Sequence, residues 1–369
     1  MLTRTPVPCP GTAIEELDTP VLLVDLDVFE ANLATLLSYC RNHGTLWRPH
    51  SKSHKCPAIA RLQLQAGACG ITCAKLSEAE LMVANGIGPV LLANQLVTRS
   101  KLDRLARLQE RQEVILAVDG PSGAALAGQA ACDHGVCIPV VLEMDIGMNR
   151  VGVRAGESAR QLARRLADTP GLELRGLMGY EGHVLAVQPR EEKVRACHQA
   201  LDILLETRTR LEADGLPLPV VSAGGTGCYD ITAAYPGITE IQAGGGVFMD
   251  AMYRYKFHVD TLDFALTCLT TVTSRSASHV VVDAGFKTLS AYHQPPTLLD
   301  RDDLQLRYLS AEHGVFDLQP NAKGPAVGDQ LRLVVGYSDS TTVLHDRFLG
   351  IRNGRVERIW QIEGRGCLD

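Results

Sequence analysis

The chain has 369 residues, of which 46% are hydrophobic and 21% are charged, and its formal net charge at pH 7 is −6. This composition is that of a globular protein and excludes an intrinsically disordered or fibrous chain. No apolar run reaches the roughly 20 residues that span a bilayer, and the charges form no clustered basic face of the kind that binds nucleic acid. We therefore expect neither a membrane nor a nucleic-acid partner, and favour an enzyme that acts on small molecules.

The chain contains eleven cysteines. No two of them have the Cys-x-x-Cys spacing of a zinc ribbon or a thioredoxin-type site. The N-terminal stretch, MLTRTPVPCPGT, lacks the apolar core of a signal peptide. We therefore expect reduced cysteines, most of them small core residues, in a cytoplasmic protein.

Short apolar runs alternate with stretches of helical length in the first two thirds of the chain. The first run, 21–26, is followed by a helical pattern over 28–42. Eight further runs have the character of strands: 45–52, 70–75, 90–94, 114–119, 139–146, 174–181, 219–225 and 240–246. Helix-length segments separate most of them, among them 77–84, 100–110, 156–168 and 190–214. Eight βα units predict an α/β fold with a (β/α)₈ barrel.

The pattern changes after Asp250. Five runs then read as strands with turns and no long helix between them: 264–273, 278–282, 304–310, 330–335 and 354–361. They predict a mostly antiparallel β domain. The barrel leaves the run at 21–26 unused, so we expect it to join this domain. The predicted division is a barrel over 28–255 and a β domain built from 1–27 and 256–369.

The end of the first barrel strand carries three basic residues. Active sites of α/β barrels lie at the carboxyl ends of the strands. Strand alternation places Arg48, His50 and Lys52 on one face, and cations inside a barrel need anionic partners. Lys52 stands at the predicted mouth, where a desolvated lysine can form a Schiff base. The alternative is a solvated strand end.

Two glycine-rich loops follow the last two barrel strands. One contains Gly225, Thr226 and Gly227, and the other contains Gly244 and Gly245. Glycines let backbone N–H groups approach an anion closely, and barrels often bind phosphate with the loops after strands seven and eight. Plain tight turns are the alternative. Together with a Schiff-base lysine, the two loops favour pyridoxal 5'-phosphate as cofactor.

Three more side chains follow the fifth and sixth barrel strands. Arg150 is suited to pair with a cofactor ring oxygen or a substrate carboxylate; a surface arginine is the alternative. Tyr180 is suited to stack on a flat ring, and His183 to carry a proton. Ordinary packing is the alternative for both.

Several motifs together resemble one family. They are Asp18-Thr19-Pro20, the stretch RPHSKSHKC at 48–56, GGTG at 224–227, VDAGFK at 282–287 and EHG at 312–314. The chain resembles the D-threonine aldolase and D-serine dehydratase family, fold-type III pyridoxal-phosphate enzymes built like alanine racemase. The resemblance implies a barrel with a β domain and a homodimer. It also implies that Lys52 holds the cofactor covalently, that the glycine loops hold its phosphate, and that Tyr180 and Arg150 lie at its ring.

The chain departs from this family at the metal motif. The family carries His-x-Asp or His-x-Cys there, whereas this chain keeps Asp339 but has Tyr337 at the histidine position. A neutral phenol is a poor metal ligand beside an imidazole. Ala186 likewise stands where aldolases commonly carry a histidine. A divalent metal, with Asp339 as its ligand, is therefore doubtful.

The sequence leaves three functions open. The favoured one is a lyase on small D-configured β-hydroxy amino acids, acting by retro-aldol cleavage or by elimination, with Lys52, His50 and His183 as the catalytic candidates. The second is a metal-free amino-acid racemase or epimerase with the same cofactor. The third is a non-catalytic pyridoxal-phosphate carrier, against which the large C-terminal domain argues.

Overall fold

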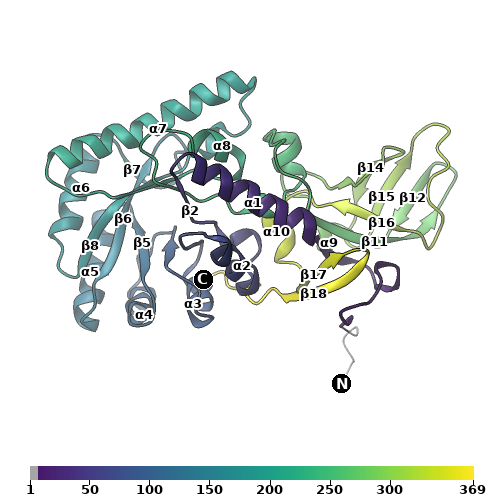
Figure 1. Cartoon of the computed structure of the whole chain (residues 1–369), viewed down its shortest axis with the longest axis horizontal. Helices are drawn as coiled ribbons and strands as arrows, with labels where there is room; N and C mark the ends of the chain where they lie inside the picture. Colours follow the sequence, from purple (N-terminus) through teal and green to yellow (C-terminus); the bar gives the residue numbers. More distant parts are fainter. Residues whose placement is uncertain (1–6) are drawn as a thin grey trace. The chain divides into compact units, whose positions relative to one another are not determined.

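The computed structural model describes residues 7–369 and contains two compact units (Figure 1). The barrel unit comprises Ala34–Lys52, Ile59–Gly244 and Gly366–Asp369. The β unit comprises the chain up to Leu33, Ser53–Ala58 and Gly245–Arg365. Over the residues described, no helix has both the length and the apolar character needed to cross a membrane.

Eight parallel strands form the barrel. They are β2 (Leu46–Trp47), β3 (Ile71–Cys73), β4 (Val90–Leu92), β5 (Val114–Val118), β6 (Ile138–Asp145), β8 (Leu172–Gly179), β9 (Val220–Ala223) and β10 (Glu240–Ile241). Their order is β2-β10-β9-β8-β6-β5-β4-β3, and the short β7 (Val153–Arg154) pairs with β6. The ring closes between β3 and β2, where the Cys69 N–H donates to the Trp47 carbonyl at 2.8 Å and His50 bridges Thr72. The predicted barrel is confirmed, with several strands shorter than predicted.

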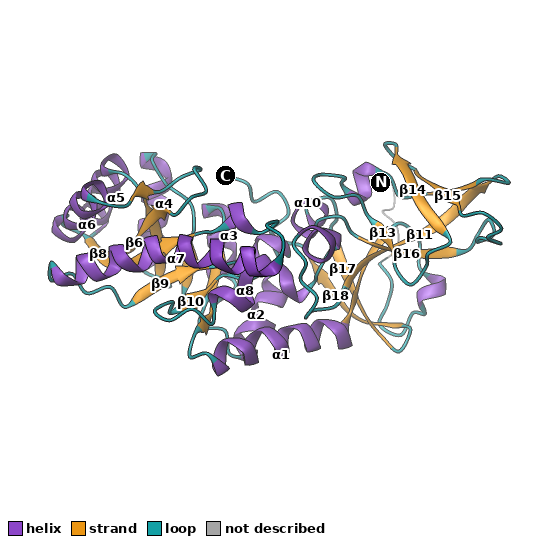
Figure 2. Ribbon diagram, turned by 90° about the horizontal axis from the view of Figure 1, so that it is seen from above, coloured by secondary structure: helices purple, strands orange, loops and turns teal. Residues whose placement is uncertain are grey.

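Helices lie outside these strands (Figure 2). They are α2 (Pro57–Ala66), α3 (Leu76–Ala84), α4 (Arg99–Gln109), α5 (Pro121–His134), α6 (Glu157–Asp168), α7 (Arg190–Ala213) and α8 (Tyr229–Thr232). The α6 helix shows why they form, because Ala159, Leu162, Ala163 and Leu166 are buried at helical spacing and the remaining positions, apart from Ala167, are polar.

The β unit contains the second sheet, with strands in the order β14-β15-β12-β11-β1-β17-β18 and β16 paired with β11 and β13. The strands are β1 (Val21–Asp25), β11 (Leu266–Arg275), β12 (His279–Val282), β13 (Thr297–Leu298), β14 (Leu304–Leu309), β15 (Gly314–Leu318), β16 (Gln330–Val334), β17 (Arg347–Arg352) and β18 (Arg355–Gln361). The expectation for 21–26 is confirmed, since β1 runs antiparallel to β11 and parallel to β17. The remaining α-helices of the described residues are α1 (Leu26–Asn42), α9 (Phe286–Leu289) and α10 (Ser338–Thr342).

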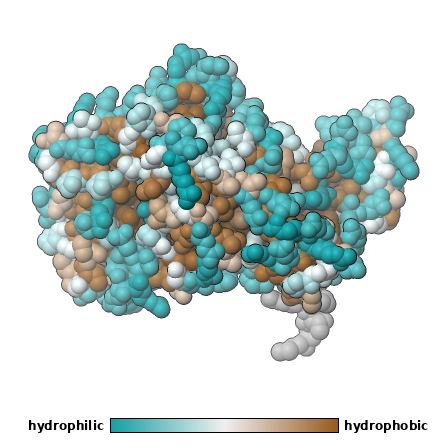
Figure 3. Space-filling view, in the orientation of Figure 1, coloured by the Kyte–Doolittle hydropathy of each residue, from teal (hydrophilic) through white to brown (hydrophobic). Residues whose placement is uncertain are grey.

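Each unit has an apolar core of its own. In the barrel, Leu91, Ile115 and Val141 pack together on neighbouring strands. In the β unit, Leu23 and Leu349 pack together across paired strands. The face in Figure 3 intersperses hydrophilic and hydrophobic residues, as an ordinary protein surface does.

Candidate functional site

Arg48 meets the anionic partner that its position required. Its guanidinium donates from Nε and Nη2 to the two carboxylate oxygens of Glu240, each at 2.9 Å, and only 7% and 3% of the two side chains are exposed. Burial alone would lower the pKa of Arg48, but the charge and hydrogen bonds of Glu240 raise it. A Cβ on Gly70, just before β3, would collide with this guanidinium. The pair therefore lies at the amino end of the barrel, away from its mouth.

Lys52 lies in a 3₁₀ turn, Ser51–Ser53, so the prediction that strand alternation aligns it with Arg48 and His50 is wrong. The strand ends at Trp47 because Pro49 has no N–H to continue the ladder. The hydroxyl of Ser51 donates to Glu78 Oε1 at 2.6 Å, and Glu78 Oε2 accepts the Ala74 N–H at 3.0 Å. The Glu78 carboxylate is fully buried, so it fixes the turn that presents Lys52.

His50 runs closely past Gly244. The His50 N–H donates to the Gln242 carbonyl at 3.2 Å, and any Cβ on Gly244 would collide with the backbone of His50. Gly244 thus allows two neighbouring strand ends to approach one another. Gly245 is in the β unit, where a Cβ on it would lie 2.6 Å from the ring of Tyr253.

Tyr180, Gly225 and Arg150 come together at the carboxyl end of the barrel. Tyr180 directly follows β8, and a Cβ on Gly225 would lie only 3.0 Å from its ring. The guanidinium carbon of Arg150 lies 6.0 Å from the ring centroid. The aromatic ring is thus lined by a glycine backbone and an exposed cation, an arrangement that fits a flat anionic cofactor.

The loop that carries Arg150 is organised by Asp145. Oδ1 of Asp145 accepts the N–H groups of Gly147 at 3.1 Å and Asn149 at 2.9 Å. Burial works against ionisation, but these backbone hydrogen bonds lower the pKa of Asp145 overall. His183 is exposed and lies on a 3₁₀ turn. It is next to this loop, since a Cβ on Gly147 would lie 2.5 Å from His183 Nε2.

Sequence reasoning did not assign a role to Glu143 on β6. This side chain is buried and accepts a hydrogen bond from Gln95 Nε2. Burial raises its pKa to about 7, partly offset by the Gln95 hydrogen bond and the charge of Arg150. The signal that points to such a residue is a carboxylate inside an apolar strand pattern.

The glycine loop after β9 fits a phosphate group. Thr226–Cys228 form a 3₁₀ turn of buried residues, and a Cβ on Gly227 would lie 3.0 Å from Leu185. Side chains are therefore absent where the backbone passes closest to its neighbours. Such a loop leaves N–H groups as the donors for an anion.

At the metal-motif position in the β unit, a phenol and a carboxylate are hydrogen-bonded to each other. The hydroxyl of Tyr337 donates to Asp339 Oδ2 at 2.7 Å, and burial and the Asp339 charge raise the pKa of this phenol. His345 is engaged elsewhere, with Nε2 2.8 Å from the Thr288 carbonyl oxygen. Within residues 7–369, no three His, Cys, Asp or Glu side chains are grouped to hold a metal ion.

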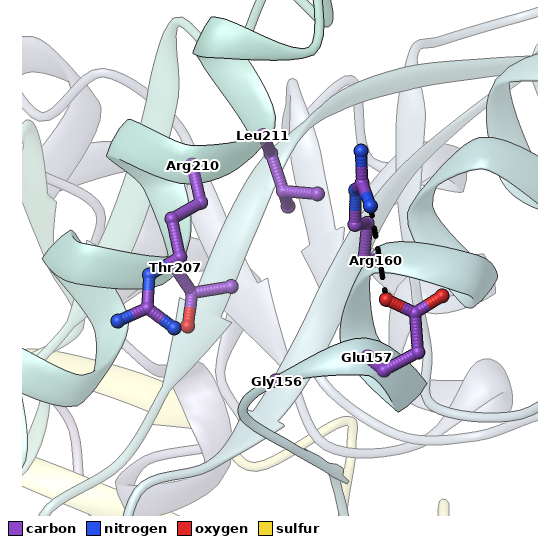
Figure 4. A pocket seen from close by; sticks show the side chains of 6 residues that line it. All are labelled: Gly156, Glu157, Arg160, Thr207, Arg210 and Leu211. Atoms are coloured by element: carbon purple, nitrogen blue, oxygen red, sulfur yellow. Dashed lines mark ion pairs between the residues drawn. The ribbon is translucent and has the colours of Figure 1, made fainter.

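A separate cavity of about 160 Å³ lies against α6 and α7 (Figure 4). Arg160 and Glu157, both on α6, form an ion pair at 3.8 Å on one side of it. It is smaller than typical ligand pockets, and none of the candidate site residues lines it.

Comparison with known proteins identifies the class to which this fold and these residues belong. A model of the alanine racemase N-terminal domain matches residues 24–251, and a serine dehydratase domain matches 265–351. The chain therefore belongs to the alanine racemase-like family that contains the D-threonine aldolases.

The similarity extends over both units. The chain is 38% identical to D-threonine aldolase from Arthrobacter sp, over 97% of this chain and 95% of that one. It is 36% identical to 3-hydroxy-D-aspartate aldolase from Paracoccus denitrificans (strain Pd 1222), over 97% and 94%. The crystal structure of D-threonine aldolase from Filomicrobium marinum matches with a TM-score of 0.95 at 35% identity, covering 98% of this chain and 100% of that one.

Proposed function

We propose that this protein is a pyridoxal-phosphate-dependent lyase that cleaves D-configured β-hydroxy amino acids by a retro-aldol reaction. The observation that carries the proposal is the full-length similarity to two aldolases, each over 97% of the chain. Elimination is the second candidate, because D-threo-3-hydroxyaspartate dehydratase from Delftia sp. (strain HT23) is 33% identical over 74% of this chain. Likeness to alanine racemases, at 12–17% identity, concerns the fold alone.

The cofactor would be held by groups of the barrel unit. Lys52, fixed by its turn, would hold it covalently, while the backbone of Gly225–Gly227 and Gly244 would receive its phosphate. Tyr180 supports the ring, and Arg150 supplies a positive charge beside it. When bound, pyridoxal phosphate supplies an electron sink for the Cα of the amino acid.

Cleavage needs a proton to leave the β-hydroxyl of the substrate and another to reach Cα. The amine of Lys52 is suited to move a proton on its own face, and the imidazoles of His50 and His183 are the other candidates. No step is assigned to a metal, because the donors at Tyr337 and Asp339 do not suit one.

Product analysis with D-threonine tests the proposal. The purified protein, saturated with pyridoxal phosphate, is incubated with D-threonine, with L-threonine as the control, with and without a chelator. Glycine and acetaldehyde from the D-isomer alone, in undiminished yield under chelation, are expected. Ammonia and 2-oxobutanoate would establish elimination instead, and exchange at Cα without either product set would contradict both lyase activities.

Assembly and compartment belong to the same proposal. We expect a homodimer, which sedimentation velocity measures directly. All eleven cysteines lie within the described residues and are free, which supports a reducing compartment such as the cytoplasm.

A further inference from the structure

One buried carboxylate that the proposed chemistry does not use lies beside the glycine loop after β9. We call Gly225–Gly227 the phosphate loop, after its proposed ligand. Glu181 follows Tyr180 directly at the end of β8 and is fully buried. Its oxygens accept hydrogen bonds from three groups of the segment after β9: the Gly224 N–H at 3.2 Å, Cys228 Sγ at 3.1 Å, and the hydroxyl of Thr232. All three donors belong to the nine-residue segment 224–232, which contains the phosphate loop.

The three donors lie on both sides of that loop. Gly224 precedes Gly225–Gly227, with a φ of +74° that an L side chain rarely adopts. Cys228 and Thr232 follow the loop, Thr232 at the end of α8. The carboxylate therefore fixes the entry and the exit of the loop, and with them the direction of the N–H groups between.

Cys228 is available as a donor because its thiol stays protonated. The hydrogen bond with Cys197, burial and the charge of Glu181 all raise the pKa of the Cys228 thiol. A buried carboxylate that accepts several hydrogen bonds is costly to disturb, since its removal leaves the donors without an acceptor. Glu181 therefore keeps its three donors while the Cys228 thiol stays protonated.

The same carboxylate connects the loop to the aromatic ring. Its chain neighbour Tyr180 packs against Gly225, the first glycine of the phosphate loop. The strand pairing Met178↔Ser222 leads directly into both segments. The consecutive residues Tyr180 and Glu181 thus both contact the phosphate loop or the residues that flank it.

We propose that Glu181 is a positioning residue that holds the 224–232 segment so that its backbone N–H groups bind the phosphate of the cofactor. The proposal rests on the proposed function, because it takes a pyridoxal phosphate as the ligand. In this role Glu181 acts through the segment to which its buried carboxylate is hydrogen-bonded. It sets how much of the binding energy comes from the phosphate group.

The test compares two ligands that differ only in the phosphate. Apoenzyme is titrated with pyridoxal phosphate and with pyridoxal, and the ratio of the two dissociation constants measures the contribution of the phosphate. For Glu181→Ala we expect this ratio to shrink by about tenfold or more, with pyridoxal binding changed little. Glu181→Gln, which retains one acceptor oxygen, and Thr232→Val, which removes one donor, are expected to give smaller losses in that order.

A matched control is Glu78→Gln. Glu78 is equally buried and fixes the Lys52 turn, so its loss is expected to weaken both ligands alike and to leave the ratio unchanged. Circular dichroism and melting curves confirm that each variant is folded. If Glu181→Ala does not fold, Thr232→Val and Glu181→Gln decide the question.

The outcomes separate the two proposals. A wild-type apoenzyme that binds neither ligand would refute the proposed function. A wild type that favours pyridoxal phosphate strongly, with folded Glu181 variants that keep the same ratio, would overturn the positioning role alone.

Discussion

Buried carboxylates at the two ends of the barrel have different hydrogen-bonding partners. At the amino end, Glu240 has a bidentate partner in Arg48, and both side chains are closed off from solvent. At the carboxyl end, Glu143 has the neutral amide of Gln95 and an exposed arginine in its vicinity, and its pKa is raised to about 7. The first arrangement holds strands together. The second gives Glu143 a pKa near neutral pH, close to the candidate cofactor-binding residue Arg150.

The largest effect is expected at the carboxyl end, from Lys52→Ala. Loss of the amine removes the covalent attachment of the cofactor, so activity should fall by roughly 10³-fold or more. The band of the bound cofactor that borohydride reduces should disappear, while the free energy of unfolding of the apoenzyme changes by less than about 1 kcal/mol. Absorbance before and after borohydride measures the first, and urea unfolding the second. A variant that retains a reducible band would show that another lysine holds the cofactor.

At the amino end, Arg48→Met is expected to show the opposite pattern. It leaves Glu240 buried without its cation, which costs about 3–5 kcal/mol. Urea unfolding of the apoenzyme measures this loss. The double variant Arg48→Met with Glu240→Leu should recover much of it, because no charge remains to be buried. An Arg48→Met protein of unchanged stability would mean that the ion pair contributes nothing to the barrel.

The Glu143→Gln variant sharpens the comparison through pH. Folded Glu143 keeps its proton up to about pH 7, whereas a glutamate of ordinary pKa, 4.5, ionises earlier. Because the unfolded state loses its proton first, wild-type stability falls relative to the variant as pH rises from about 4.5 to about 7, and the difference is constant above.

The amplitude of this change is up to about 3 kcal/mol. Melting curves of both proteins across that window measure it, and contributions from other titrating groups cancel in the difference. Parallel curves for the two proteins would show that Glu143 ionises normally.

The smallest effect is expected outside the barrel, at Tyr337→His. An imidazole beside Asp339 restores a pair of metal donors, so affinity for Mn²⁺ should rise by about tenfold. Isothermal titration calorimetry of the apoenzyme measures it, with Tyr337→Phe as the control that removes the hydroxyl and adds no donor. Equal Mn²⁺ binding by both variants would show that position 337 does not face a metal.

Periodicity in the sequence predicted the fold well where local pattern and burial agree. Each of the eight barrel runs overlaps a strand. The clearest case is β5, VILAV, which is apolar throughout because every one of its residues is buried. The strands β15 and β17 escaped notice. Their sequences, GVFDL and RFLGIR, mix small, charged and apolar residues, and their pairing comes from distant neighbours.

The candidate site was predictable only in part, and for a physical reason. Lys52 and the glycine loops stand out by residue type and position, although Lys52 lies in a 3₁₀ turn where the sequence predicts a strand. The sequence does not single out Glu78, Glu143 and Glu181, because their roles depend on hydrogen-bonding partners that are distant in the sequence. Glu181, for example, binds Thr232 from 51 residues away. Only the closed barrel brings such donors to one carboxylate.

The position of β1 in the middle of its sheet has a consequence for synthesis of the chain. Leu349 of β17 pairs with Leu23 of β1, so β1 lacks this partner until β17 has left the ribosome. At translation rates of about 5–20 residues per second, that wait is roughly 15 seconds to a minute. The barrel strands pair mostly with successive neighbours and complete their ladders earlier. A nascent chain therefore carries an apolar segment near residue 21 that lacks its sheet partners until β11 and β17 have been synthesised, which makes this segment a natural binding site for chaperones.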